Sequence, residues 1–189
     1  MKILRYPDYR AVPWKNGGGI TREILAEEDA AGGGFLWRLS MATVAASGPF
    51  SHFLGIDRTI ACLDGDGMRL AFNDGREETV AMGGVPLAFP GEADIHADCI
   101  GGETLDLNVM TRRDRFRHSL TRIAAEDDLT IAGAPVRAII LDAPATVETA
   151  TVAAAAGRYD TVLLEPGDHP VTLRAIAGVA AFLVTLIAL

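Results

Sequence analysis

The sequence predicts an all-β fold, and three observations support this. Apolar residues fall mainly in short runs that alternate with polar residues, which is the period of a half-buried strand. Turn-forming groups such as Gly65-Asp66-Gly67 and Asn73-Asp74-Gly75 separate these runs. No long segment keeps a helical period, and Ala153–Ala156 are too few to form an independent helix. We therefore expect many short strands joined by tight turns.

Composition describes an ordinary globular protein. The chain has 189 residues, 49% of them hydrophobic and 22% charged, which suits one large domain or two small ones packed together. A net charge of -8 argues against nucleic-acid binding, because phosphates need a basic face. A cluster of arginines is better explained as a solvated turn than as a phosphate site, since no aromatic or glycine pattern accompanies it. Its members are Arg112, Arg113, Arg115, Arg117 and Arg122.

The cysteines and the termini indicate a cytoplasmic protein with no membrane partner. Cys62 and Cys99 lack the spacing of a zinc or redox site, so we expect small buried residues in a reducing compartment. The N-terminus has no extended apolar core of the kind a signal peptide needs. Residues 176–189 are apolar but fall short of the roughly 20 residues of a spanning helix. We expect them to form a buried terminal strand.

A loop with three consecutive glycines follows an extended N-terminal segment, residues 3–12. Gly17, Gly18 and Gly19 are costly to order, so a folded protein keeps them where only glycine fits. Two interpretations stay open: a tight barrel corner with positive φ, or a loop whose backbone amides face a ligand. No Lys-Ser/Thr pair follows, so this is not a Walker loop.

Residues 35–45 alternate as a strand with an apolar face and a mixed face. The apolar face, expected in the core, carries Phe35, Trp37, Leu39 and Met41. Arg38 lies on the other face with Ser40 and Ala42. Solvent is the slightly favoured position for Arg38 over the interior of a barrel, because charged residues are rarely buried.

The central stretch, residues 48–67, has the pattern strand, corner, strand and hairpin turn. Gly48-Pro49 forms a turn, and Asp57-Arg58 opens a short apolar run that Gly65-Asp66-Gly67 closes. Residues 68–72 then alternate, Asn73–Arg76 make a hairpin turn, and Glu77–Met82 return as an exposed strand.

Residues 105–111 form the second strand that bears on function. Asp106 and Asn108 share one face, and Leu105, Leu107 and Val109 share the other. A carboxylate and an amide inside a barrel form either a hydrogen-bonded structural pair or part of a pocket. Buried polar groups need partners, and Arg58 is a candidate partner for Asp106.

The rest of the chain reads as further short strands. These are Val136–Leu141, Thr161–Leu164, Val171–Ile176 and Val179–Leu189. No linker separates them from the first part, so we expect one compact unit made of two sheet systems. The expected division places the motif-bearing half at residues 1–122 and a degenerate half at residues 123–189.

Five motifs in order resemble the HutD/Ves family. They are Pro13-Trp14-Lys15-Asn16-Gly17-Gly18-Gly19 with Thr21-Arg22-Glu23; Trp37-Arg38-Leu39-Ser40-Met41-Ala42; Gly48-Pro49-Phe50-Ser51 with Asp57-Arg58; Phe89-Pro90-Gly91-Glu92; and Asp106-Leu107-Asn108-Val109-Met110-Thr111-Arg112. The resemblance implies a bicupin, two jelly-roll barrels in one compact unit. It also implies a bacterial cytoplasmic protein that moderates histidine utilisation by binding a small intermediate, such as formylglutamate or formate, rather than by catalysis.

The stretch at residues 48–67 also resembles the first metal-binding motif of cupins, but with its ligands replaced. Ser51 and Phe53 stand near the places of the paired histidines, leaving His52 between them, and Asp57-Arg58 stands where a carboxylate ligand would follow. His96 falls near the position of a further histidine. A metal needs three or four converging ligands, so we expect no metal and no cofactor.

Arg58 is the centre of the expected ligand site, because a guanidinium can bind a carboxylate in place of the lost metal. Lys15 and Asn16 are expected to add donors, and Trp14 and Phe50 to exclude water. Ser51, Asp106 and Asn108 complete the expected set of ligand-binding residues.

Three alternatives stay open. In the first, Arg58 pairs internally with Asp57 or Asp106, and the motifs only maintain barrel geometry. In the second, the protein is a metal-free isomerase or hydrolase with Asp106 or His52 as general acid or base. In the third, the protein serves only in assembly through exposed strand edges; whether it forms a homodimer is also open. We assign no catalytic residue, because the sequence offers no nucleophile, base and orienting group together.

Overall fold

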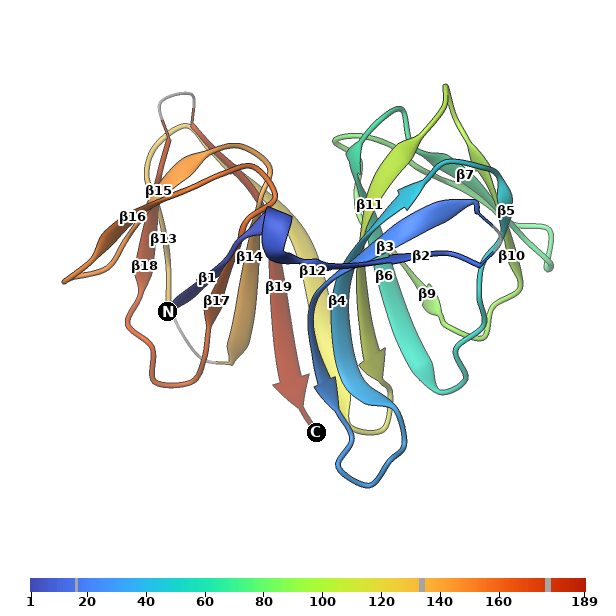
Figure 1. The fold of residues 1–189 in the computed structure, drawn as a ribbon, viewed down its shortest axis with the longest axis horizontal. Helices are drawn as coiled ribbons and strands as arrows, with labels where there is room; N and C mark the ends of the chain where they lie inside the picture. Colours follow the sequence, from blue (N-terminus) through green and yellow to red (C-terminus); the bar gives the residue numbers. More distant parts are fainter. Residues whose placement is uncertain (16, 133–134, 176–177) are drawn as a thin grey trace. The chain divides into compact units, whose positions relative to one another are not determined.

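The structure, a computed structural model, describes residues 1–15, 17–132, 135–175 and 178–189. Within those residues the regular secondary structure is all strand, apart from one short 3-10 helix at Tyr6–Asp8. The all-β prediction is therefore confirmed. The chain divides into two compact units, each made of two sheets (Figure 1). We call residues 10–117 with 188–189 the N-terminal unit, and residues 1–9 with 118–187 the C-terminal unit.

The N-terminal unit contains a six-stranded and a four-stranded sheet. The six-stranded sheet has the order β2 (Arg10–Pro13), β3 (Gly19–Glu28), β4 (Phe35–Val44), β11 (Thr104–Arg112), β6 (Ile56–Asp64) and β9 (Leu87–Pro90). The four-stranded sheet has the order β5 (Gly48–Pro49), β10 (Ile95–Cys99), β7 (Met68–Phe72) and β8 (Glu77–Val80). The antiparallel neighbours β4, β11 and β6 run through the centre of the six-stranded sheet and carry much of the site.

Apolar side chains fill one part of the N-terminal unit. A cluster of buried residues joins the two sheets, with Ile60 on β6 and Met68, Leu70 and Ile95 on the smaller sheet. On β4 the side chains of Trp37, Leu39 and Met41 are buried, as the apolar face predicts. Removing apolar surface from water stabilises the folded state by about 25 cal/mol per Å² of surface buried.

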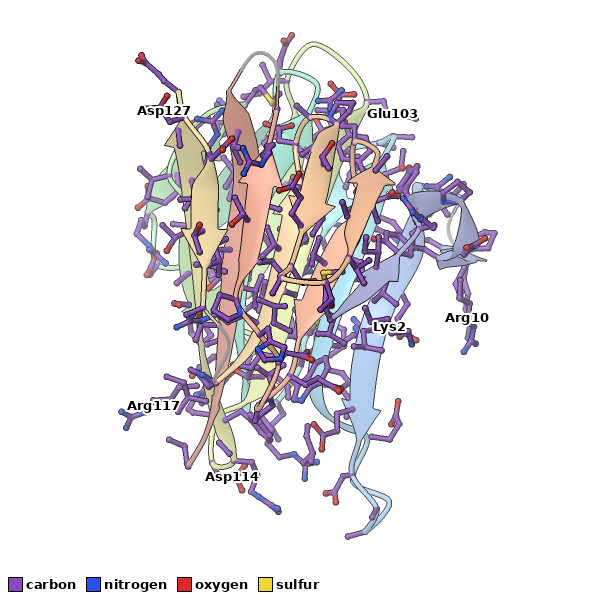
Figure 2. The ribbon with its side chains drawn as sticks, turned by 90° about the vertical axis from the view of Figure 1, so that its left-hand side faces the viewer. Lys2, Arg10, Glu103, Asp114, Arg117 and Asp127 are labelled. Carbon is purple, nitrogen blue, oxygen red and sulfur yellow. The ribbon has the colours of Figure 1, made fainter. Side chains whose placement is uncertain are left out.

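The C-terminal unit repeats the two-sheet plan. One sheet has the order β1 (Lys2–Leu4), β17 (Thr161–Leu164), β14 (Val136–Leu141), β19 (Val179–Ala188) and β12 (Phe116–Ala125). The other has the order β13 (Leu129–Ile131), β18 (Val171–Arg174), β15 (Ala145–Glu148) and β16 (Ala153–Ala156). Figure 2 shows these sheets with their side chains, with Arg117 and Asp127 at opposite ends of β12.

Apolar residues pack between the sheets of the C-terminal unit. Ile139, Val147, Val162 and Leu173 are fully buried in this cluster. Residues 179–188 of the terminal segment form β19, as expected, with buried positions recurring along the strand up to Leu186; residues 176 and 177 of that segment lie outside the described residues. Ala153–Ala156 form a strand, β16, rather than a helix.

The first nine residues lie in the C-terminal unit, whereas the expected division placed them with residues 10–122. The reason is strand pairing, since β1 runs antiparallel to β17 with Ile3 opposite Val162. Asp160 holds the segment further: its side chain accepts hydrogen bonds from Tyr6 N at 2.9 Å and from Arg5 Nη1 at 2.8 Å. The other end of the expected boundary, residue 122, falls within β12.

Among the described residues no helix has both the length and the apolar character needed to cross a bilayer.

Candidate functional site

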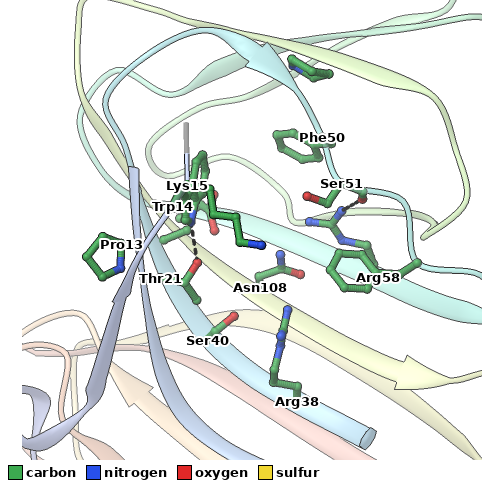
Figure 3. A pocket seen from close by; sticks show the side chains of 14 residues that line it. Pro13, Trp14, Lys15, Thr21, Arg38, Ser40, Phe50, Ser51, Arg58 and Asn108 are labelled. Atoms are coloured by element: carbon green, nitrogen blue, oxygen red, sulfur yellow. Dashed lines mark hydrogen bonds between the residues drawn. The ribbon is translucent and has the colours of Figure 1, made fainter. Parts of the chain in front are cut away.

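The N-terminal unit holds a pocket of about 470 Å³, a volume typical of small-molecule sites. Seven of the eight residues expected from the sequence to bind a ligand line it: Trp14, Lys15, Phe50, Ser51, Arg58, Asp106 and Asn108. The eighth, Asn16, lies outside the described residues. Figure 3 shows these side chains, with Lys15 and Arg38 directed toward Asn108.

Three neighbouring strands supply the polar floor of the pocket. Asn108 on β11 lies opposite Ser40 on β4, and Asp106 lies opposite Ala42. Met110 lies between Arg38 on β4 and Arg58 on β6. Alternate residues of a strand share a face, so these rows of side chains point to the same side of the sheet. The register of β4, β11 and β6 therefore gathers two guanidinium groups, a carboxyl group and an amide.

Arg58 is a buried cation in an aromatic environment. Its side chain is 7% exposed, and the guanidinium carbon lies 5.0 Å from the ring centres of Phe50 and Phe89. Nη1 donates a 3.3 Å hydrogen bond to Ser51 O, while Nε has no partner among the described residues. Burial lowers the pKa of Arg58 to about 10, against the attraction of Asp106. Arg58 therefore remains charged at neutral pH.

The first open alternative, internal pairing of Arg58, has two possible partners, Asp57 and Asp106. Asp57 is engaged elsewhere, since its Oδ1 accepts a 2.6 Å hydrogen bond from Arg113 Nε at the surface. Asp106 attracts Arg58 electrostatically from within the pocket. Asp106 is therefore the remaining candidate for an internal partner of Arg58.

Arg38 is a residue that sequence analysis missed. Solvent was the slightly favoured position, and that expectation is wrong, because Arg38 is partly buried and lines the pocket. Its Nη2 lies 3.2 Å from Met110 Sδ and its guanidinium carbon 5.0 Å from the Phe35 ring centre. Burial lowers its pKa, while Glu23 and Glu28 oppose that shift. The sequence signal that could have placed Arg38 in the pocket was its strand face, which it shares with Ser40.

Asp106 and Asn108 both line the pocket. Their side chains are 3% and 9% exposed, and within the described part of the chain neither Oδ1 atom accepts a hydrogen bond. Burial raises the pKa of Asp106 to about 7, and Arg58 opposes the shift. A buried polar atom that stays unpaired costs about 1–3 kcal/mol, so both groups favour a ligand that hydrogen-bonds to them.

The glycine loop forms a tight corner at one side of the pocket. Gly17 has a φ of +73° and donates a 3.0 Å hydrogen bond to Trp14 O. A side chain at Gly19 would place its Cβ 2.4 Å from Thr43 O and 3.0 Å from the Trp14 ring. Trp14 Nε1 in turn donates to Thr21 Oγ1 at 2.8 Å. The corner interpretation therefore accounts for Gly17 and Gly19, and the same corner sets the position of Trp14 against the pocket.

The residues at the cupin metal position do not fit a metal. His52 and His96 have side chains 57% and 55% exposed, each 3.6 Å from a surface carboxylate, Asp94 and Asp98 respectively. Across the described residues, no three His, Cys, Asp or Glu side chains gather in a way that would hold an ion. A divalent metal needs several converging ligands, which this set does not supply.

Comparisons with known sequences agree with the motifs. The family model described as HutD matches residues 6–182. An uncharacterised 21.2 kDa protein in the hutC 3′ region of Pseudomonas putida is 35% identical over 172 residues, covering 89% of each chain. Protein Ves of Citrobacter koseri is 38% identical over 118 residues, covering 60% of this chain and 61% of its own.

Solved structures give the fold. A conserved protein of unknown function from Pseudomonas aeruginosa PAO1 superposes with a TM-score of 0.85 at 30% identity, covering 100% of this chain and 98% of its own. A HutD from Pseudomonas fluorescens SBW25, solved in a formate condition, has a TM-score of 0.84 at 25% identity with the same coverage. A cupin barrel protein from Leptotrichia buccalis, at 9% identity and a TM-score of 0.61, covers 98% of this chain and 100% of its own. The expectation of a bicupin is confirmed.

Proposed function

Because the chain belongs to the HutD family, which is associated with histidine utilisation, we propose that it binds a small carboxylate intermediate of that pathway in a metal-free barrel pocket. The ligand is of the formylglutamate or formate type. Binding modulates the pathway without turnover. The observation that carries the proposal is the buried guanidinium of Arg58, which lines a pocket where Arg38 Nε, Asp106 Oδ1 and Asn108 Oδ1 also lack hydrogen-bond partners among the described residues.

The charges of the pocket suit an anion. Arg58 keeps one Nε–H unpaired among the described residues, and so does Arg38. Guanidinium groups bind carboxylates through two parallel hydrogen bonds, which gives both energy and orientation. Since β11 separates β4 from β6, the backbones that carry the two arginines lie about 10 Å apart. That separation allows a ligand with two carboxylates to contact both arginines.

The site favours binding over catalysis. Ser51 lines the pocket, but His52 does not, and its imidazole lies beside Asp94 near the surface. A serine nucleophile needs a base within hydrogen-bond reach. One observation favours the alternative, a metal-free isomerase or hydrolase: the Asp106 pKa of about 7 suits a general acid or base.

Thermal unfolding with a panel of compounds tests the proposal. The panel is urocanate, formiminoglutamate, formylglutamate, glutamate and formate, each with chelator and with added divalent metal. A ligand at one hundred times its Kd adds about 2.7 kcal/mol to the free energy of unfolding, roughly 5–11 °C in Tm for a chain of this size. We expect such a rise with formylglutamate in chelator.

The panel also discriminates between explanations. A rise with one carboxylate only, unaffected by metal, supports the pocket. Equal Tm values with every compound, or a rise that requires metal, would contradict it.

A further inference from the structure

Asp106 is an unusual group to find in a pocket for anions. It lies on β11 opposite Ala42 and Cys62, at the inner end of the polar floor. It is the one carboxyl group among the described residues that line the pocket. A permanent negative charge at that place would repel the ligand proposed above.

We propose that Asp106 takes up a proton from solvent when a carboxylate ligand binds, and that the protonated side chain then donates a hydrogen bond to the ligand. The inference rests on the proposed function. It assigns to Asp106 the role of a residue that couples ligand affinity to pH.

The geometry supports a donor at this position. Asp106 is 3% exposed, and its Oδ1 has no hydrogen-bond partner within the described part of the chain. An ionised carboxylate only accepts hydrogen bonds, whereas a protonated carboxyl group offers one O–H donor. A ligand carboxylate likewise only accepts. Contact between the two therefore requires a shared proton, as it does in pairs of carboxyl groups that occupy one site.

Burial and the charged groups around Asp106 determine whether its carboxyl group is protonated. Arg58 on β6 attracts the ionised form, but burial outweighs it and raises the pKa of Asp106 to about 7. Arg38 on β4 and Lys15 beside β3 add positive charge to the pocket, and Glu23 and Glu28 on β3 offset Arg38. A ligand carboxylate adds negative charge near Asp106, which moves its pKa further up.

The thiols nearby do not titrate in the same range. Burial raises the pKa of Cys62, opposite Asp106 on β6, to about 11. Burial also raises the pKa of Cys99 on β10. Both thiols therefore keep their protons between pH 6 and 8. Protonated Asp106 leaves the charge of Arg58 available to the ligand, whereas ionised Asp106 competes for it.

The proposal gives a quantitative pH dependence. With an Asp106 pKa of about 7 in the free protein, Kd should increase about tenfold from pH 6 to pH 8. Proton uptake should be about 0.9 per ligand at pH 8 and about 0.1 at pH 6, following the ionised fraction of the free carboxyl group.

Isothermal titration calorimetry with formylglutamate tests this. The titration is run at pH 6 and pH 8, each in two buffers that differ widely in ionisation enthalpy, so that the difference in heat counts protons. We expect wild type to show the uptake above. The isosteric variant Asp106→Asn keeps a neutral donor, so it should take up no proton and hold the same Kd at both pH values. His52→Gln, which removes the exposed imidazole next to Ser51, should behave as wild type.

Each other outcome has a distinct meaning. Saturable binding with equal heats in both buffers at pH 8 would overturn proton coupling and leave the proposed function standing. Loss of binding in a folded Asp106→Asn protein at pH 6 and pH 8 would show that binding requires the ionised carboxylate rather than a neutral donor, which also overturns the inference. No binding to wild type at either pH would reject the proposed function, and the inference with it. If Asp106→Asn does not fold, the buffer comparison on wild type decides alone.

Discussion

Replacing Arg58 with methionine is expected to weaken formylglutamate binding by about 100-fold or more, which is about 2.7 kcal/mol. Arg58 is the most buried cation of the pocket and, in the proposed complex, the main partner of a ligand carboxylate. The unliganded protein should be as stable as wild type or more so. Methionine fills a similar space against Phe50 and Phe89 and removes the cost of a buried charge.

The two readouts together separate a binding role from a structural one. Calorimetry gives the Kd, and thermal unfolding without ligand gives the stability. If Arg58 serves only as a structural partner of Asp106, Arg58→Met should lower Tm and leave the affinity for formylglutamate within a few-fold of wild type. Arg69→Met is the matched control, because Arg69 is an exposed arginine paired with Asp98 outside the pocket.

Asp160→Ala is expected to lower the free energy of unfolding of the C-terminal unit by about 3 kcal/mol. Asp160 is 5% exposed and accepts hydrogen bonds from Arg5 Nη1, Tyr6 N and Gly157 N. The variant loses the charge pair and leaves two backbone N–H groups without their acceptor. Thermal unfolding followed by circular dichroism measures the loss.

The same variant has a predictable pH dependence. Burial raises the pKa of Asp160, but the hydrogen bonds from Tyr6, Gly157 and Arg5 outweigh it, so the folded pKa lies below the usual value. A depressed pKa contributes stability above the unfolded pKa of about 3.9, and that contribution is lost as pH falls through the folded pKa. The gap between wild type and Asp160→Ala should therefore be full at pH 7 and narrower at pH 3.

Glu148→Ala is the control that separates the loss of the buried Asp160 contacts from the loss of any carboxylate in the same unit. Glu148→Ala removes an exposed carboxylate 2.8 Å from Arg174 Nε in the same unit. Exposed pairs contribute about 0–1 kcal/mol, so its effect should be small. A loss for Asp160→Ala no larger than that of Glu148→Ala would contradict the role we give to Asp160.

Strand alternation was enough to predict much of the pocket. It put Asp106 and Asn108 on one face and Leu105, Leu107 and Val109 on the other, and the register of β11 keeps that arrangement. The motifs added Trp14, Lys15 and Phe50 from loops, which no periodicity locates. Those residues are gathered around the same pocket.

Long-range pairing was beyond the reach of the sequence. Alternation gives the face on which Arg38 lies, but whether that face lines an interior or meets solvent depends on how distant strands close the barrel. The position of Met1–Tyr9 was missed for the same reason. The pairing of Lys2 with Leu163 joins residues at opposite ends of the chain and has no local signal.

The central claim is that the pocket binds a small carboxylate without metal and without turnover. A single ¹H NMR sample tests this claim most directly. It contains formylglutamate and the protein in excess chelator, and spectra are recorded over hours. The account predicts saturation transfer from the protein to the ligand and a formyl signal of constant intensity. Absence of transfer would contradict binding, and replacement of the formyl signal by that of free formate would show that the protein is an enzyme.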